Sequence, residues 1–183
     1  NIPVEAVEME FPIRIGRCRL WQDSAGAGRW RGGLGLEKIF EATRAELTVS
    51  HRGERFYTAP WGLFGGLPAR NGDAWVLRQG GSREAVPSKQ VLTLKPGEQL
   101  HVFLAGGAGH GDPLERDAER VRADVLDRRV SLRAAAEDYG VALDPRSLAV
   151  DGGAAEALRS QKRAARGPIT WPYDRGPGLD REV

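Results

Sequence analysis

The sequence predicts an α+β protein: an antiparallel, glycine-loop-rich β domain, then short C-terminal helices and an extended tail. Up to about residue 105, short apolar runs alternate with glycine turns, a pattern typical of β-strands. No helix-length segment separates these runs, which favours antiparallel pairing. From residue 112 the apolar spacing changes to three and four residues, the period of a helix. We therefore divide the chain into a β-rich domain at 1–111, a helical segment at 112–167 and a tail at 168–183.

The β-rich domain begins without a methionine, inside a strand-like pattern that runs from Ile2 through Val4 and Val7 to Ile15. We expect a further segment before it. Lys95-Pro96-Gly97-Glu98 predicts a tight turn, because proline presets one φ and glycine accepts a positive φ. The strands predicted by alternation and turn residues are 11–21, 36–42, 45–51, 73–78, 83–86, 90–94 and 99–104.

Three helices are predicted from their start and stop signals. Asp112 and Glu115 frame Pro113 as in a capping box, which predicts a helix over 113–128. Ser131 caps a second helix over 131–139, and Asp151 caps a third over 151–166.

In the tail, Trp171 and Tyr173 lie among prolines and glycines. We expect them to dock on another chain or on a separate part of the same subunit.

Composition excludes several classes of protein. The chain has 27 basic and 25 acidic residues, and no basic block is interleaved with aromatics, so nucleic acid binding is not indicated. No apolar run approaches the ~18 residues of a membrane span, and no signal peptide is recognised. The single Cys18 cannot form an internal disulfide, which favours a cytoplasmic protein.

Residues 23–35 form the most informative loop, with five glycines between positions 26 and 35. The glycines allow the backbone to approach a partner or ligand closely, and N–H groups beside Gly26 and Gly28, together with Arg31, could clasp an anion. Asp23 and Ser24 offer an acceptor and a hydroxyl at this candidate site, and Asp23 could hold the glycine turn closed by accepting from backbone N–H groups. It is not a phosphate-binding P-loop, because the GxxxxGK[ST] pattern is absent. The alternative is a wide glycine turn whose arginines bridge to a neighbouring subunit.

Two further stretches are candidates for chemistry. His51 and Arg52 could bind a carboxylate or transfer a proton, or could be a surface pair. His110 lies in a glycine-rich stretch before a predicted helix N-terminus, which suits an anion. The alternative for His110 is an exposed or hydrogen-bonded position in a connection, and His101 is expected to be structural. No metal-ligand spacing or GxSxG nucleophile pattern is present, so we assign no catalytic residue and no metal ligand.

The order of the glycine stretches resembles one family. The loop Asp23-Ser24-x-Gly26-x-Gly28-x-x-Arg31-Gly32-Gly33-x-Gly35 is similar to the signature of hydantoinase B and 5-oxoprolinase subunits. Further matching positions are Arg52, Pro60-Trp61-Gly62-Leu63, Gly65-Gly66 and Gly106-Gly107-x-Gly109-x-Gly111-Asp112-Pro113 with Arg116-Asp117. The match begins at Asn1-Ile2-Pro3-Val4-Glu5, Glu8 and Phe11-Pro12, and it continues through Val121, Asp124-Val125, Val130-Ser131, Ala135 and Tyr139-Gly140-Val141. The resemblance covers about residues 1–167 and corresponds to the C-terminal part of the longer family subunit.

This resemblance implies a segment of an ATP-dependent cyclic-amide hydrolase, or of a related ketone carboxylase. ATP would phosphorylate the substrate oxygen, and the activated species would be hydrolysed or carboxylated. The implied partners are a hydantoinase A-type subunit, which binds ATP, and the N-terminal part of hydantoinase B, on the same or a separate chain. ATP and Mg²⁺ or another divalent metal are expected on those other parts. The alternative is a non-catalytic structural or assembly subunit of such a complex.

Overall fold

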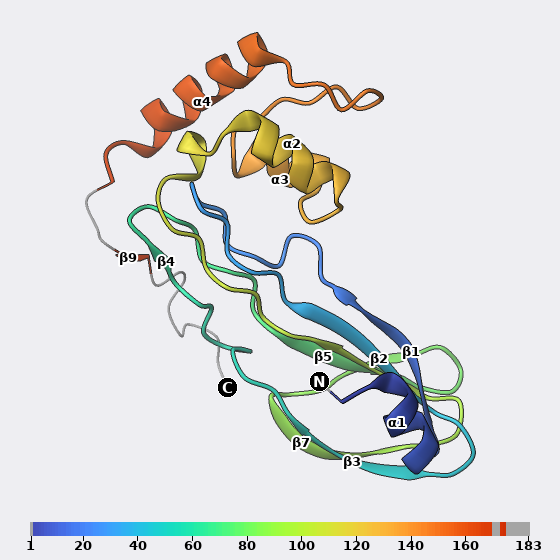
Figure 1. Cartoon of the computed structure of the whole chain (residues 1–183). Helices are drawn as coiled ribbons and strands as arrows, with labels where there is room; N and C mark the ends of the chain where they lie inside the picture. Colours follow the sequence, from blue (N-terminus) through green and yellow to red (C-terminus); the bar gives the residue numbers. More distant parts are fainter. Residues whose placement is uncertain (1, 170–172, 175–183) are drawn as a thin grey trace. The chain divides into compact units, whose positions relative to one another are not determined.

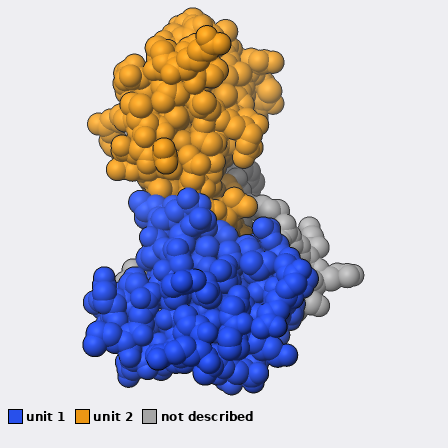
Figure 2. Space-filling view, turned by 90° about the vertical axis from the view of Figure 1, so that its right-hand side faces the viewer, with its two compact units in different colours: residues 1–20, 36–56, 72–104 blue, residues 21–35, 57–71, 105–183 orange. Residues whose placement is uncertain are grey.

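The computed structural model describes residues 2–169 and 173–174 (Figure 1). The chain forms two compact units, which Figure 2 colours blue and orange. Unit 1 comprises residues 1–20, 36–56 and 72–104, and unit 2 comprises residues 21–35, 57–71 and 105–183. Each helix and strand falls wholly within one unit. The consecutive division at residues 111 and 167 stays a prediction, since a compact unit is not by itself an independently folding domain.

Unit 1 is built from two antiparallel sheets. The five-stranded sheet has the order β1-β2-β8-β5-β6, and the two-stranded sheet pairs β3 with β7. The strands are β1 (Ile13–Leu20), β2 (Leu36–Ala42), β3 (Leu47–Arg52), β5 (Asp73–Leu77), β6 (Arg83–Ala85), β7 (Lys89–Leu94) and β8 (Gln99–Phe103). The predicted antiparallel strands and the α+β class are confirmed.

Alternation along these strands produces the core of unit 1. On β5 and β7 the buried positions alternate with more exposed ones, as the two-residue period requires. The turn predicted at 95–98 is confirmed: Glu98 N donates to Lys95 O (2.9 Å), and Gly97 has a φ of +84°. The buried residues of this core are Ala42, Ala74, Val76, Val86, Leu92, Leu94 and Leu100.

The strand-like interpretation of the first residues is wrong. Residues Val4–Glu10 form helix α1, and β1 starts only at Ile13. Val4 and Val7 are spaced for one helix face, and Phe11 becomes extended because the residue before a proline avoids the helical region. Glu8 Oε1 accepts a hydrogen bond from Ile15 N (2.7 Å) and so holds α1 on β1.

Unit 2 contains most of the helices. Ser131 caps α3 (Leu132–Glu137) and Asp151 caps α4 (Gly152–Arg166), each accepting a hydrogen bond from a backbone N–H, as predicted. A short pair, β4 (Gly62–Leu63) with β9 (Tyr173–Asp174), was missed because two-residue strands carry no alternation. Trp171 lies outside the described residues, so the docking of the tail aromatics stays a prediction.

The predicted helix over 113–128 is interrupted. Asp112 caps only a single 3₁₀ turn, η1 (Pro113–Glu115), and Arg116 then becomes extended. Asp117 caps a separate helix, α2 (Ala118–Leu126), by accepting from Arg120 N. The second cap was overlooked because the apolar spacing continues across the break.

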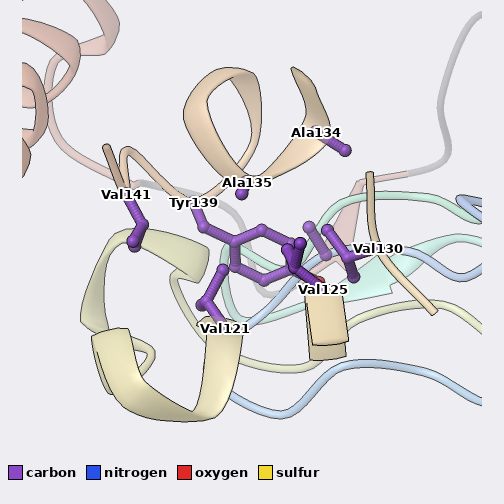
Figure 3. Close-up of a cluster of buried hydrophobic side chains, with 8 residues drawn as sticks. Val121, Val125, Val130, Ala134, Ala135, Tyr139 and Val141 are labelled. Carbon is purple, nitrogen blue, oxygen red and sulfur yellow. The ribbon is translucent and has the colours of Figure 1, made fainter. Parts of the chain in front are cut away.

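The apolar core of unit 2 lies between α2 and α3. The Tyr139 ring sits at its centre, surrounded by valines and alanines (Figure 3). The buried members are Ala27, Val121, Val125, Val130, Ala134, Ala135, Tyr139 and Val141.

Candidate functional site

Three glycine-rich segments of unit 2 lie against one another, although they are far apart in sequence. They are residues 26–35, 62–67 and 105–111. Backbone hydrogen bonds join them: Gly26 N to Gly107 O (2.9 Å), Leu67 N to Ala27 O (2.7 Å) and Leu63 N to Gly109 O (3.0 Å). We call this arrangement the glycine junction.

Glycine is needed here because the backbones touch. A Cβ on Gly32 would lie 1.9 Å from Gly107 O, and one on Gly109 would lie 1.9 Å from Ala27 O. A Cβ on Gly26 would lie 2.1 Å from Leu67 O, and one on Gly28 would lie 2.6 Å from His110 N. The backbone of this loop therefore approaches other segments of the same unit closely, and the expected approach to a partner or ligand stays a prediction.

Asp23 and Ser24 fix the base of the first segment. Ser24 is fully buried; its hydroxyl donates to Trp21 O (2.5 Å) and accepts from Gly35 N (2.8 Å), which closes the loop. Asp23 has a φ of +58°, a conformation that aspartate tolerates better than most residues. Its carboxylate accepts from Ser131 N (2.7 Å) and so ties the loop to the start of α3.

Arg31 is held by a buried carboxylate. Its Nε and Nη2 lie 3.1 and 3.3 Å from the two oxygens of Asp124, and its Nη1 donates to Gly32 O (2.6 Å). Arg116 Nη2 also donates to Asp124 (2.8 Å), and Arg129 Nη1 lies 3.7 Å from it. Asp124 thus serves three guanidinium groups, and the planar fork of Arg31 is directed inward at the protein.

A second ion pair joins α4 to the turn that follows the third glycine segment. Arg166 makes two hydrogen bonds to the Asp112 carboxylate (2.9 and 2.8 Å). Burial alone would raise the pKa of Asp112, but Arg166 and the N–H of Leu114 together hold this pKa below its ordinary value. From the same helix, Arg159 donates to the carbonyls of Tyr139 (3.1 Å) and Arg116 (2.6 Å).

His110 lies at the surface of the glycine junction. Its backbone exchanges two hydrogen bonds with Trp30 (2.9 and 3.0 Å), and it also forms a bridge with Leu63. The ring of Phe64 contacts the imidazole edge-on, with centroids 5.2 Å apart. The predicted position before the η1 turn is correct, and the side chain is exposed among apolar neighbours.

The predicted site residues divide between the two units. Six of them belong to unit 2: Asp23, Ser24, Gly26, Gly28, Arg31 and His110. Arg52 belongs to unit 1, where it ends β3 with its side chain exposed. Anion binding by any of these residues stays a prediction.

The two carboxylates that organise unit 2 electrostatically were not predicted as site residues, since Asp112 was expected as a cap and Asp124 only as a position of the family resemblance. A signal for Asp124 was available: it lies on the buried face of α2, three residues after Val121 and beside Val125. An acidic residue within an apolar stripe requires a buried partner. The partner itself, 93 residues earlier, was not predictable from helix spacing.

A polar cavity of about 460 Å³ lies beside the first glycine segment, at α3. Arg70, Arg133, Glu137 and Asp138 are its charged lining residues together with Asp23. Burial, and then the nearby charges of Asp23 and Glu137, raise the pKa of Asp138. Three carboxylates and two arginines line this cavity, so it offers no uniform charge for an anion.

The described residues do not fit a metal site, since nowhere do they bring three His, Cys, Asp or Glu side chains together around one point. We therefore derive no metal-dependent step from this segment. Over the same part of the chain, no helix is long and apolar enough to cross a membrane.

The arrangement matches one part of much larger enzyme subunits. The fold is similar to that of a nucleotide-free acetone carboxylase, with a TM-score of 0.72 and 23% identity, over 90% of this chain and 26% of that one. It is also similar to the ATP-dependent caprolactamase from Pseudomonas jessenii, with a TM-score of 0.66 and 28% identity, over 86% of this chain and 28% of that one. In sequence, the chain is 34% identical to caprolactamase subunit beta of Pseudomonas jessenii over 145 residues, which are 77% of this chain and 25% of that subunit. The chain thus spans about a quarter of the length of these relatives.

Residues 1–113 match the family described as hydantoinase B/oxoprolinase. The chain belongs to this family, as its glycine stretches predicted.

Proposed function

We propose that this chain is the C-terminal segment of a hydantoinase B-type subunit, in an ATP-dependent enzyme that opens cyclic amides or carboxylates ketones. The observation that carries this proposal is the family match over residues 1–113, with an ATP-dependent caprolactamase and an acetone carboxylase among the similar structures. ATP and a divalent metal would be bound by a hydantoinase A-type partner and by the N-terminal part of hydantoinase B. Hydrolase and carboxylase remain two outcomes of the same test.

Within that enzyme, the role that the geometry supports for this segment is positioning. The glycine junction leaves little room for backbone movement, because its carbonyls and N–H groups are in contact. Arg31 is anchored on Asp124, so any surface it presents is held in one place. We propose that this loop steadies either the phosphorylated intermediate or the partner surface that delivers it.

The alternative is a non-catalytic assembly subunit. The observation that favours it is that Arg31 directs Nε, Nη1 and Nη2 at protein acceptors, with a side chain only 14% exposed. In that case the arginine is a structural cross-link between residues 31 and 124.

The experiment is reconstitution. This chain is combined with the N-terminal part of a hydantoinase B subunit and a hydantoinase A-type subunit, and ATP consumption is measured with hydantoin, 5-oxoproline, caprolactam or acetone. We expect substrate-dependent ATP hydrolysis by the complex and no turnover by the 183-residue chain alone. Turnover by the isolated chain would refute the proposal.

Arg31→Lys separates the two roles, because lysine keeps the charge and loses the fork. In the assembled enzyme we expect turnover to fall at least tenfold while the complex stays intact. The matched control is Arg29→Lys, an exposed arginine of the same loop. Normal turnover of an assembled Arg31→Lys enzyme would support the assembly role.

A further inference from the structure

The polar cavity of unit 2, with a volume of about 460 Å³, has apolar as well as charged lining residues. Pockets for small molecules typically measure about 300–1,000 Å³ and place a few polar groups in an apolar lining. Most of the apolar side chains here are small, which leaves space between the first glycine segment and α3. They are Ala25, Ala27, Leu67, Pro68, Ala69 and Ala134. The cavity therefore has room and apolar surface for a short aliphatic chain.

One carboxylate of this cavity has no partner in the protein. Asp138 directly follows α3 and is partly buried, yet no described residue donates a hydrogen bond to its carboxylate or forms an ion pair with it. Burial, then the charges of Asp23 and Glu137, raise the pKa of Asp138, and the charges of Arg133 and Lys162 offset only part of this. An unsatisfied carboxylate in a cavity is typical of a functional site, because a cationic ligand group would pair with it.

Asp23 brings a second carboxylate to the same place. Its Oδ1 accepts from Ser131 N (2.7 Å), and its Oδ2 accepts no hydrogen bond from any residue that the structure describes. Since the charge of Asp23 raises the pKa of Asp138, the two carboxylates are close enough to share one cation. An ammonium group suits them, because it carries three N–H donors. A metal ion would need further ligands, and the described residues do not gather them.

A guanidinium group of the same cavity lacks a carboxylate. The backbone N of Arg70 donates to Ser24 O (3.0 Å), and its side chain lies over the Trp21 ring, 4.3 Å from the centroid. No acidic residue in the described part of the chain pairs with Arg70. A guanidinium over a ring keeps its in-plane N–H donors available to a carboxylate. The other arginine, Arg133, already donates to Glu137, so the unpaired groups of the cavity are of both signs.

We propose that this cavity binds a small zwitterion with an aliphatic body, whose ammonium group pairs with Asp138 and Asp23 and whose carboxylate pairs with Arg70. A simple anion would leave both carboxylates unpaired, and a simple cation would leave the arginine unpaired. A ring-opened cyclic amide is one molecule of this class, since hydrolysis leaves an amine and a carboxylate on one chain. The proposal does not depend on the proposed function, because it concerns one cavity of unit 2.

The test uses 6-aminohexanoate, hexanoate and hexylammonium as probes, because they share a six-carbon chain and differ only in their charged ends. Each is titrated at pH 7 into the full 183-residue chain, by calorimetry and by NMR of the backbone amides of Ala25, Ala69 and Ala134. We expect 6-aminohexanoate to bind about tenfold tighter than either of the others, since it alone forms both charge-assisted contacts. Turnover is not measured, so a failure here leaves the proposed function standing.

Two variants assign the two ends of the ligand. In Asp138→Asn the preference for 6-aminohexanoate over hexanoate should disappear, and in Arg70→Gln its preference over hexylammonium should disappear. The matched controls are Asp127→Asn and Arg146→Gln, at exposed positions of unit 2 that do not line the cavity, and they should bind as wild type.

If Arg70→Gln fails to fold, the relative affinities of the wild-type chain for the three probes decide together with Asp138→Asn. The proposal would be overturned if hexylammonium bound as tightly as 6-aminohexanoate, or if no probe bound. A preference for the zwitterion that survived both substitutions would overturn it as well.

Discussion

The core of unit 1 consists of alternating apolar side chains from two sheets, whereas unit 2 is organised around backbones that touch and carboxylates that gather arginines. In unit 1 the core consists of packed apolar side chains, and the alternation of residues along each strand determines which of them point inward. In unit 2 the decisive contacts join residues 26–35, 62–67 and 105–111, and one aspartate joins α2 to the first of these segments. The difference teaches that a glycine-rich sequence can specify dense packing as strictly as an apolar one.

The largest effect is expected from a methyl group in the glycine junction. In Gly109→Ala the new Cβ would lie 1.9 Å from the carbonyl oxygen of Ala27. The atoms it would meet belong to the backbone of Gly26 and Ala27, so no side-chain rotation can remove the clash. We expect a loss of about 5 kcal/mol of unfolding free energy, confined to unit 2. Hydrogen exchange of peptides from each unit measures this.

The control is Gly33→Ala, because no described atom other than those of its chain neighbours lies within 4 Å of a Cβ placed there. Its stability should stay within about 0.5 kcal/mol of wild type. If Gly109→Ala is as mild as this control, the glycine junction does not hold unit 2 together.

Asp124→Asn tests the electrostatic part of unit 2. Removing the charge leaves Arg31 and Arg116 without their shared carboxylate in a buried place, which costs about 4 kcal/mol. Asp127→Asn is the matched change on an exposed ion pair with Arg129 and should cost less than about 1 kcal/mol. Urea unfolding of both variants is the measurement, and equal losses would contradict the central role of Asp124.

Leu94→Ala tests how much a buried apolar side chain contributes to the stability of unit 1. Leu94 is 1% exposed in the core, so its truncation should cost about 3 kcal/mol and accelerate exchange in unit 1 peptides. Val91→Ala, on the same strand but 67% exposed, should cost less than about 1 kcal/mol. If Leu94→Ala accelerated hydrogen exchange equally in peptides of unit 2, the two units would not differ in how they are stabilised.

Asp138→Asn should have the smallest effect and the opposite sign. The pKa of Asp138 is raised by burial and by neighbouring acids, so its carboxylate form is unfavourable in the folded state. Its contribution to stability is present at low pH and is lost as pH rises through the folded pKa. The variant should therefore melt slightly higher than wild type at pH 7 and equally near pH 3, below the ordinary aspartate pKa of about 3.9. A gain that persists at pH 3 would assign the effect to packing instead.

Local features of both units were predictable from the sequence, whereas contacts between distant segments were not. Strand alternation in unit 1 and the helix caps Ser131 and Asp151 in unit 2 are local signals, and the structure confirms them. The glycine stretches predicted close approach but not its target, because Gly32 and Gly107 are separated by the strands of unit 1. Helix α1 was missed because Ile2, Val4, Phe11, Ile13 and Ile15 include pairs at the two-residue spacing of a strand, although Val4 and Val7 fit only the helical period. The pair of Arg31 with Asp124 has no local signature.

The interleaving of the two units has a consequence for synthesis on the ribosome. The chain leaves unit 1 after residue 20 and again after residue 56, returns each time, and completes that unit only at residue 104. Unit 2 still lacks Gly107, Gly109 and Asp124 at that moment, so its first two segments cannot yet form their contacts with the third. A chain break at any point between residues 21 and 103 would separate parts of both units. During synthesis, unit 2 therefore cannot fold until residues beyond 104 have emerged from the ribosome.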